Sequence, residues 1–384
     1  MLFTNIFIPL SAEMKELASI LLALILATAA TLWMGYGKQI FYPASEPLET
    51  IPPQPTIQSD TVRLVFGGDL MQHLPQVEAA QCADGSFDYS RSFEYITPLF
   101  RSADAAILNL ETTLTTSKRY SGYPSFASPT DLANAMVDMG VDIALLANNH
   151  CCDRGSRGIE TTIEQLKRRG IAHTGAFADS EERASHSPLY FERRGIRFAL
   201  INYTYGTNGI PTPKGRHVNR IDTTAIKHEL RTIDKDSVDC IIACMHWGIE
   251  YECRPNRTQL QLEDLLKREG VDIIIGSHPH VIQPFKVDSV TTTFYSLGNL
   301  VSNQRKRYTD GGLIAEIEVV RCDTIEGIRL KATPHPVWVL CPNYRILPRE
   351  VADTMSMTAQ ARQACDTFFS DSDKLLGIKQ IVAD

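Results

Sequence analysis

Two histidines flank a proline in the segment GSHPH at residues 276–280, directly after the very apolar run 271–275. The fixed φ of proline holds the imidazoles of His278 and His280 apart, and neutral imidazole is a common ligand of zinc, iron, manganese and nickel. The spacing therefore predicts a pair of metal ligands on a turn at the end of a strand. The alternative is an ordinary surface turn, because patterns this short often match by chance.

Polar clusters also follow other apolar runs of the chain, in the same phase. They are GGD at 67–69, NLE at 109–111, NNH at 148–150, NY at 202–203, HWG at 246–248 and GN at 298–299. The carboxyl ends of successive parallel strands meet at one edge of a sheet, where α/β proteins place their sites. Clusters repeated in this way favour one functional site at that edge over a series of unrelated turns.

The clusters contain two carboxylates, one amide oxygen and three imidazoles that suit divalent cations. The predicted metal ligands are Asp69, Glu111, Asn149, His246, His278 and His280. One or two ions of Mn, Fe, Zn or Mg at such a site bind a substrate oxyanion and lower the pKa of a water. Glu111 is the best candidate to bridge two ions, because its side chain is longer than that of Asp69.

His150 directly follows the predicted ligand Asn149. Adjacent side chains diverge, so His150 is predicted to face the substrate and to protonate a leaving oxygen as a general acid. Asp153 is predicted either to orient His150 or to cap the helix that begins near Gly155. Substrate contacts are predicted for Asn109, Trp247, Glu250, Tyr251 and Asn299, with Asx turns as the alternative for the two asparagines and core packing for the two aromatic residues.

The elements that must position these residues alternate between short apolar runs and amphipathic stretches of helical period, which predicts an α/β fold. Strands are expected at 62–66, 105–108, 143–146, 198–201, 240–244, 271–275 and 293–297, and closing strands at 313–319, 328–332 and 337–340. Helices are expected at 129–139, 158–169, 223–233 and 258–269, and a helical tail at 351–376.

The composition is that of an ordinary globular protein, with 43% hydrophobic and 22% charged residues in 384. The formal net charge of -7 argues against a nucleic-acid partner, because phosphate binding requires clustered Lys and Arg. The nine cysteines include no CxxC pair, so they define neither a zinc finger nor a disulfide framework. Cys151 and Cys152 lie within the predicted site loop.

Residues 17–34 form a stretch without a charged side chain that is just long enough to cross a hydrocarbon core. We expect a single-pass anchor in the cell membrane with an extracytoplasmic main domain. A signal peptide cleaved after Ala27-Thr28-Ala29 is the alternative. The predicted organisation is a tail and anchor at 1–40, a proline-rich tether at 41–60, a main domain at 61–345 and a C-terminal helical tail at 346–384.

Six motifs spread from Val62 to about Asn303 carry a family resemblance. They read GGDLM, NLETTL, ANNHCCDRG, HWGIEY, GSHPHV and YSLGNLV, in this order. The set resembles the bacterial capsule synthesis protein CapA family of poly-γ-glutamate capsule biosynthesis, which looks related to the calcineurin-like metallophosphoesterases. The resemblance implies a layered αββα sandwich with a dinuclear metal centre, in which the six predicted ligands hold metal and His150 acts as the acid.

One position departs from the phosphoesterase pattern. Those enzymes place a His two residues after the first Asp, and this chain has Met71, a poor ligand for hard divalent ions. The first metal site is therefore expected to lack a ligand. Three alternatives follow: water or another side chain replaces the ligand, the site binds its ion weakly, or the protein works with one ion.

The expected function is that of a membrane-anchored protein acting on an anionic surface polymer or its precursor beside membrane synthase subunits. Its expected chemistry is metal-dependent hydrolysis or transfer. A non-catalytic scaffold that binds the polymer is the main alternative, and a cytosolic phosphoesterase is the third.

Overall fold

The computed structural model describes residues 21, 24–25, 59–288, 291–322 and 327–377. The described residues from Ser59 onward form one compact unit. The predicted anchor at 17–34 and the predicted tether at 41–60 lie almost wholly outside the described residues. Within the described part of the chain, no helix combines the length and hydropathy needed to cross a membrane.

The compact unit contains two large sheets. The first has eight strands in the order β18-β17-β16-β1-β2-β5-β6, with β15 also paired to β1. Its strands are β1 (Ser59–Leu70), β2 (Ala105–Leu110), β5 (Ile143–Leu145), β6 (Ala172–Thr174), β15 (Asn299–Val301), β16 (Gly311–Cys322), β17 (Ile328–Leu340) and β18 (Arg345–Pro348). The strands from β1 to β6 are parallel, as expected for strands joined by helical crossovers.

The second sheet has six strands in the order β13-β14-β12-β11-β9-β8. Its strands are β8 (Leu189–Arg193), β9 (Ile196–Thr204), β11 (Cys240–His246), β12 (Ile273–Ser277), β13 (Phe285–Val287) and β14 (Thr292–Phe294). Strands β9, β11, β12 and β14 are parallel. Short pairs outside the two sheets are β3 (Leu114–Thr115) with β4 (Ser128–Pro129) and β7 (Ala176–Phe177) with β10 (His217–Val218).

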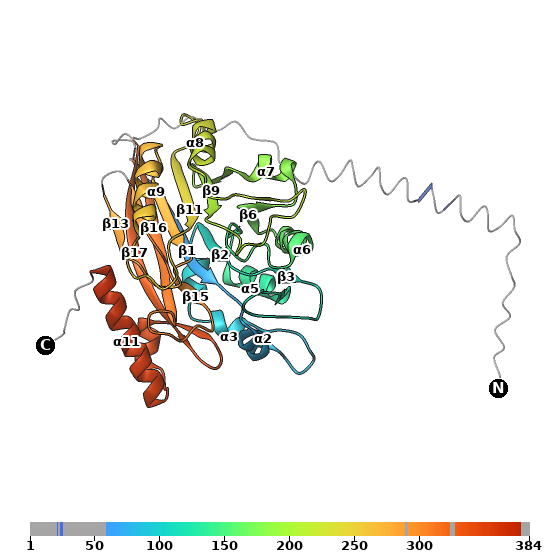
Figure 1. The fold of residues 1–384 in the computed structure, drawn as a ribbon, viewed down its shortest axis with the longest axis vertical. Coiled ribbons are helices and arrows are strands. Elements are labelled where there is room, and N and C mark those ends of the chain that lie inside the picture. Colours follow the sequence, from blue (N-terminus) through green and yellow to red (C-terminus); the bar gives the residue numbers. More distant parts are fainter. Residues whose placement is uncertain (1–20, 22–23, 26–58, 289–290, 323–326, 378–384) are drawn as a thin grey trace, which may run out of the picture. The chain divides into compact units, whose positions relative to one another are not determined.

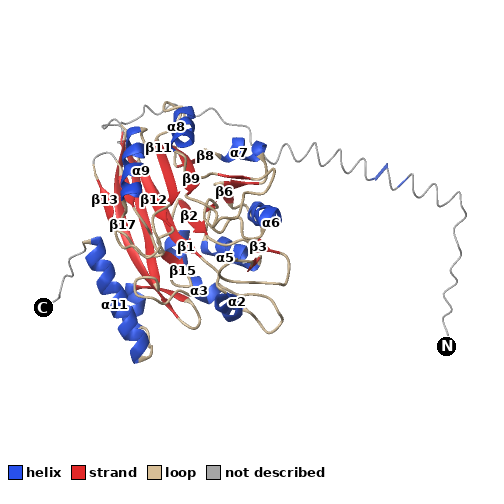
Figure 2. Cartoon of the chain, viewed as in Figure 1, coloured by secondary structure: helices blue, strands red, loops and turns tan. Residues whose placement is uncertain are grey.

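Apolar side chains fill the space between the sheets and cover both outer faces. Phe66 and Ile107 of the first sheet lie in one buried cluster with Phe198, Ile242 and Ile275 of the second. The outer face of the first sheet packs on α5 (Asp131–Met139) and α6 (Gly155–Lys167), and that of the second on α8 (Thr223–Thr232) and α9 (Arg257–Arg268). The α/β fold class predicted from the sequence is confirmed, and the order of layers is helix, sheet, sheet, helix (Figures 1 and 2).

The remaining helices are mostly short. They are α2 (Leu74–Ala80), α3 (Ser90–Phe93), α4 (Thr97–Arg101), α7 (Ser180–His186), α10 (Arg349–Thr354) and the longer α11 (Ala359–Leu376). The segment expected to be a helical tail contributes β18 to the first sheet as well as α10 and α11. Phe368 and Phe369 of α11 are buried in the cluster between the sheets.

The chain crosses from one sheet to the other where a single strand was expected at 293–297. Strand β14 ends at Phe294 in the second sheet, and β15 begins at Asn299 in the first. Between them, the Gly298 carbonyl accepts a hydrogen bond from the Asp69 N–H at 2.9 Å. A Cβ on Gly68 would lie 2.2 Å from that carbonyl oxygen, so glycine is required there. The expectation was correct for Thr293 and Phe294 but wrong for residues 295–297, because the chain leaves the second sheet after Phe294 and joins the first at Asn299.

Asn202 links the two sheets by hydrogen bonds. Its Oδ1 accepts from the backbone N–H of Ala147 at 2.8 Å, and its Nδ2 donates to the Cys244 carbonyl at 3.0 Å. Ala147 follows β5 of the first sheet, whereas Asn202 and Cys244 lie in β9 and β11 of the second. The buried amide therefore sets the position of the loop that carries Asn149 and His150.

Replacing this link tests its contribution. Asn202→Ala leaves the buried Ala147 N–H without its acceptor and removes the side-chain donor to the Cys244 carbonyl, so we expect a loss of about 2 to 4 kcal/mol in unfolding free energy. Urea unfolding followed by circular dichroism measures the loss. The exposed Asn343→Ala serves as the control and should stay within about 0.5 kcal/mol of the parent. Equal stability of the two variants would contradict the proposed link.

Candidate metal centre

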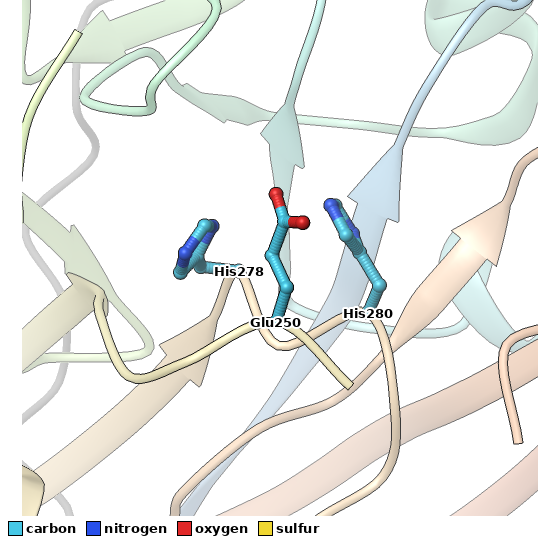
Figure 3. Close-up of side chains that lie close together, drawn as sticks. All are labelled: Glu250, His278 and His280. Carbon is cyan, nitrogen blue, oxygen red and sulfur yellow. The ribbon is translucent and has the colours of Figure 1, made fainter. Parts of the chain in front are cut away.

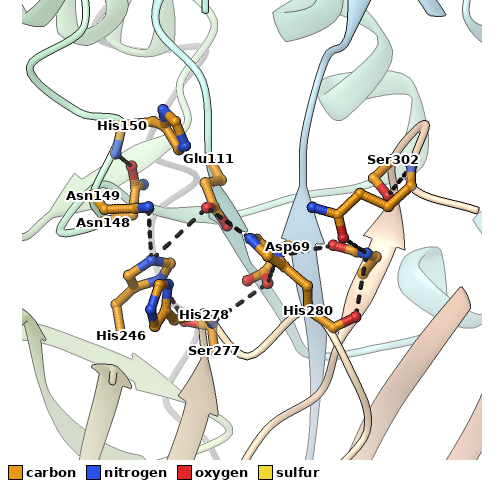
Figure 4. Close-up of polar contacts among 12 residues, drawn as sticks. Asp69, Glu111, Asn148, Asn149, His150, His246, Ser277, His278, His280 and Ser302 are labelled. Atoms are coloured by element: carbon orange, nitrogen blue, oxygen red, sulfur yellow. Dashed lines mark hydrogen bonds and ion pairs between the residues drawn. The ribbon is translucent and has the colours of Figure 1, made fainter. Parts of the chain in front are cut away.

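Strands from both sheets deliver polar side chains to one buried cluster. Asp69 is the penultimate residue of β1, and Glu111 follows β2. His246 ends β11, and His278 and His280 follow β12. All five are at most 3% exposed. Figure 4 shows them converging from the two sheets, as the strand-end argument predicted.

The two carboxylates share one amide. Asn109 Nδ2 donates to Asp69 Oδ1 at 2.8 Å and to Glu111 Oε2 at 3.2 Å. Asn109 is held in turn by Asn148, whose Nδ2 donates to Asn109 Oδ1 at 3.2 Å. The amide satisfies one oxygen of each acid and leaves the other oxygen of each turned toward the imidazoles.

Glu111 Oε1 lies between two imidazoles of the second sheet. It is 3.8 Å from His246 Nε2 and 3.8 Å from His280 Nε2. The other nitrogen of each ring has its own partner: His246 Nδ1 is 3.0 Å from Ser277 Oγ, and His280 Nδ1 is 3.0 Å from Asp69 Oδ2. Partners of this kind orient the rings and direct Nε2 into the cluster.

A second group forms around the loop after β12. The ligand atoms of Glu250, His278 and His280 all lie within 4.8 Å of one another, and the Glu250 carboxylate stands between the two rings in Figure 3. His278 and His280 have φ values of 96° and 58°, which non-glycine residues rarely adopt. Strained backbone of this kind is concentrated at functional sites, where the surrounding structure holds it in place.

Burial and like charges dominate the electrostatics of the cluster. Burial, followed by the neighbouring imidazole of His278, holds the pKa of His246 well below its usual range. Burial and the His280 ring lower the pKa of His278 to about 3. Burial and the nearby Asp69 carboxylate raise the pKa of Glu111 well above its usual range. The lowered pKa values favour the neutral form of His246 and His278, which is the form that binds metal ions.

The residues fit a divalent cation. Two buried ligand atoms of the cluster, Glu111 Oε1 and His278 Nδ1, have no hydrogen-bond partner among the residues that the structure describes, although buried polar atoms are normally satisfied. Asp69, Glu111 and His246 form a group whose ligand atoms lie within 4.8 Å of one another, alongside the group that contains Glu250. Mixed carboxylate and imidazole ligands suit Zn, Fe and Mn in particular.

Asn149, His150 and Asp153 lie beside the cluster. Asn149 Oδ1 is 2.9 Å from His246 Nε2. His150 Nδ1 is 2.8 Å from Asp153 Oδ2, which also accepts the Phe126 N–H at 2.6 Å. Helix α6 has Arg154 as its N-cap and no side-chain cap, so Asp153 orients His150 and does not cap the helix.

The predicted substrate-binding residues divide into three groups. Asn299 Oδ1 lies 3.1 Å from His280 Nδ1, so this buried amide orients the His280 ring, as the Asn109 amide orients the Asp69 and Glu111 carboxylates. Tyr251 is exposed at the rim, with its ring centroid 6.3 Å from that of His280. Trp247 faces away from the site, packed in the core beneath α9, with its indole N–H bonded to the Tyr295 carbonyl. The core-packing alternative therefore applies to Trp247, and direct substrate contact stays a prediction for the other four residues.

Several residues of the site were not predicted. The Tyr205 ring lies 4.4 Å from that of His278, and Asn208 bonds to Asn149 at 3.2 Å and reaches His150 Nε2 at 3.5 Å. Both follow β9, so the same strand-end argument points to them. Glu250 was predicted only as a polar contact, and its proximity to two histidines makes it a candidate ligand. Met71 is buried and offers no hard ligand atom, whereas Glu250 lies close enough to His278 and His280 to be a candidate for the missing ligand.

Comparison with known proteins confirms the resemblance carried by the six motifs. The chain belongs to the family described as bacterial capsule synthesis protein PGA_cap, whose model matches residues 63–304, more than half of the chain.

Named relatives cover most of the chain. It is 27% identical over 340 residues to the PGA biosynthesis protein CapA of Bacillus subtilis, covering 83% of this chain and 86% of the relative. It is 25% identical over 328 residues to the capsule biosynthesis protein CapA of Bacillus anthracis, covering 80% and 77%. Among solved structures, the NAD nucleotidase of Haemophilus influenzae superposes with a TM-score of 0.46 at 12% identity, covering 82% of this chain and 63% of that one.

Substitution of Glu250 tests the second ligand group. Glu250→Gln removes a charged ligand at an exposed position, so we expect the protein to stay folded and one metal equivalent to bind about 10- to 100-fold more weakly. Elemental analysis of protein purified without chelators, followed by titration with Mn²⁺ or Zn²⁺, measures this. Glu252→Gln, exposed and two residues away, is the matched control. Unchanged metal content and affinity in Glu250→Gln would exclude Glu250 as a ligand.

Proposed function

We propose that this protein acts in the synthesis, export or attachment of an anionic surface polymer of the poly-γ-glutamate type, through metal-assisted hydrolysis or transfer. Family membership and the names of the two CapA relatives support the process. The chemistry rests on one observation above all: the unpartnered Glu111 Oε1, 3.8 Å from two buried imidazoles. A divalent ion at such ligands polarises a phosphoryl or acyl oxygen and lowers the pKa of a water.

His150 and its neighbours supply the proton chemistry. Asp153 accepts from His150 Nδ1 and so fixes the ring, which leaves Nε2 to carry the proton given to the leaving oxygen. Asn208 Nδ2 lies 3.5 Å from that Nε2, and since the amide N–H donates, this contact forms when Nε2 has given up its proton. The Phe126 ring packs edge-on against the imidazole with centroids 4.6 Å apart, which excludes water from one side of the pair.

His150→Ala tests the acid role. We expect kcat on aryl phosphodiesters or monoesters to fall about 10²- to 10⁴-fold, because the leaving oxygen loses its proton donor. Metal content should stay the same, since His150 is not a proposed ligand. Asp153→Asn should lower kcat in the same direction, and the exposed His228→Ala should leave it unchanged.

Two outcomes would contradict the chemistry. Activity that survives both rigorous chelation and the pair His278→Ala with His280→Ala would exclude metal assistance. A fully metal-loaded parent protein that turns over no phosphoester and no polymer linkage would favour the non-catalytic scaffold, in which the same rim only binds the polymer.

We also propose that residues 17–34 anchor the protein in the cell membrane, with residues 57–384 extracytoplasmic beside synthase subunits. The charge-free apolar stretch supports this proposal. Fractionation tests it: the full chain should remain in membranes after high-salt washing and be released by detergent, whereas a chain that begins at residue 41 should be soluble. Recovery of both chains in the soluble fraction would contradict the anchor.

A further inference from the structure

A groove lies beside the candidate metal centre, on the outer side of the loop that packs on His150. It has a volume of about 670 Å³ and is bounded by the loop 114–121 and by the start of α6. A neighbouring hollow of about 600 Å³ shares Arg119 and Tyr120 with it. The two together offer an extended surface, larger than a single small ligand requires. Figure 1 shows β3 and α6, which flank the groove, on the same side of the first sheet.

The lining of the groove is cationic. It contains Arg119, Arg154 and Arg157, together with Ser and Thr hydroxyls, and no Asp or Glu. Nearby arginines are neutralised: Arg168 pairs with Glu164, and Arg216 pairs with Glu160. Within the part of the chain that the structure describes, none of the three groove arginines forms an ion pair with a carboxylate.

Unpaired guanidinium groups are unexpected on this protein, whose formal net charge is -7. Exposed Arg side chains on an acidic protein readily find carboxylates, so three that share a groove without one leave a local positive field. Guanidinium groups bind carboxylates in a planar, bidentate manner, and the hydroxyls of Ser117 and Thr116 add neutral donors.

The groove is connected to the proposed acid through a short chain of contacts. Arg154 donates to the Ser121 hydroxyl and, at 2.7 Å, to the Ser125 carbonyl. Ser125 Oγ donates to the Asp153 carbonyl at 3.0 Å, and the Asp153 carboxylate holds His150. One loop therefore forms a wall of the groove on one side and supports His150 on the other.

We infer that this groove binds a stretch of a linear polycarboxylate, with Arg119 and Arg157 contacting successive carboxylates of the chain. The inference rests on the proposed function, since it supplies the polymer-binding surface for the same site. Several arginines along the groove suit a ligand that carries a negative charge on each repeating unit. The groove and the neighbouring hollow share Arg119 and Tyr120, so one extended ligand could occupy both.

The test uses the full chain in detergent and a short, fluorescein-labelled poly-γ-glutamate fragment, with binding followed by anisotropy. Arg119→Ala combined with Arg157→Ala should weaken binding about tenfold and reduce its salt dependence. Arg119→Lys combined with Arg157→Lys should recover part of the affinity, because the charge remains without the bidentate geometry. Arg168→Ala on the same helix is the matched control and should bind like the parent.

The outcomes separate this inference from the proposed chemistry. Hydrolysis of a small aryl phosphodiester should be unchanged in the double alanine variant, since neither arginine belongs to the catalytic machinery. Equal polymer binding by parent and double variant would overturn the groove even where that hydrolysis is present. Weaker polymer binding by the double variant would support the groove even where the parent hydrolyses nothing. Binding of polyphosphate of the same length with equal affinity and equal sensitivity would overturn the assignment to carboxylates.

Discussion

Two carboxylic acids are buried at the ends of neighbouring parallel strands, and most features of the site follow from that constraint. Asp69 and Glu111 are both fully buried, and together they would place two negative charges in a medium of low dielectric constant, which is unfavourable unless cations or donors offset it. The Asn109 amide offsets one oxygen of each acid. The buried His246 and His278 rings of the second sheet provide ligand atoms but no positive charge. Burial raises the pKa of Glu111, and a divalent cation at these ligand atoms would favour its ionised form.

This requirement explains why the two sheets must meet closely at one edge. A ligand set split between β1 and β2 on one side and β11 and β12 on the other works only at a fixed separation. Gly68 allows the Gly298 carbonyl to approach where the chain enters the first sheet, and within the second sheet Gly276 allows the close approach of the Tyr295 carbonyl. The hydrogen bond from the Ala147 N–H to Asn202 Oδ1 joins the two sheets. The left-handed conformations of His278 and His280 represent local strain that this framework supports.

Sequence reasoning predicted the participants better than their orientation. Parallel strand ends share an edge, so the convergence of Asp69, Glu111, His246, His278 and His280 followed from apolar runs alone, although their role as ligands stays a prediction. The predicted substrate contact of Trp247 ignored the alternation of side chains on extended backbone. Because His246 faces the site, its neighbour Trp247 faces the opposite side and packs in the core. Glu250 could not be placed from the sequence. Its position depends on the turn around Tyr251, whose φ of 69° no local pattern predicted.

The contrast between the buried cluster and its surroundings bears on the kind of substrate. Most ligand atoms lie in the interior, and Glu250 and Tyr251 are the predicted site residues that are exposed. A substrate therefore reaches the cluster with one group while the rest of the molecule stays outside. A long anionic chain as the proposed substrate would have to be held despite the net negative charge of the protein, and a local cationic surface is one means of doing so. The groove arginines supply such a surface next to the loop that positions His150. The proposed polymer contacts of Arg119 and Arg157 and the support of His150 by Ser125 and Asp153 therefore lie on two sides of one loop.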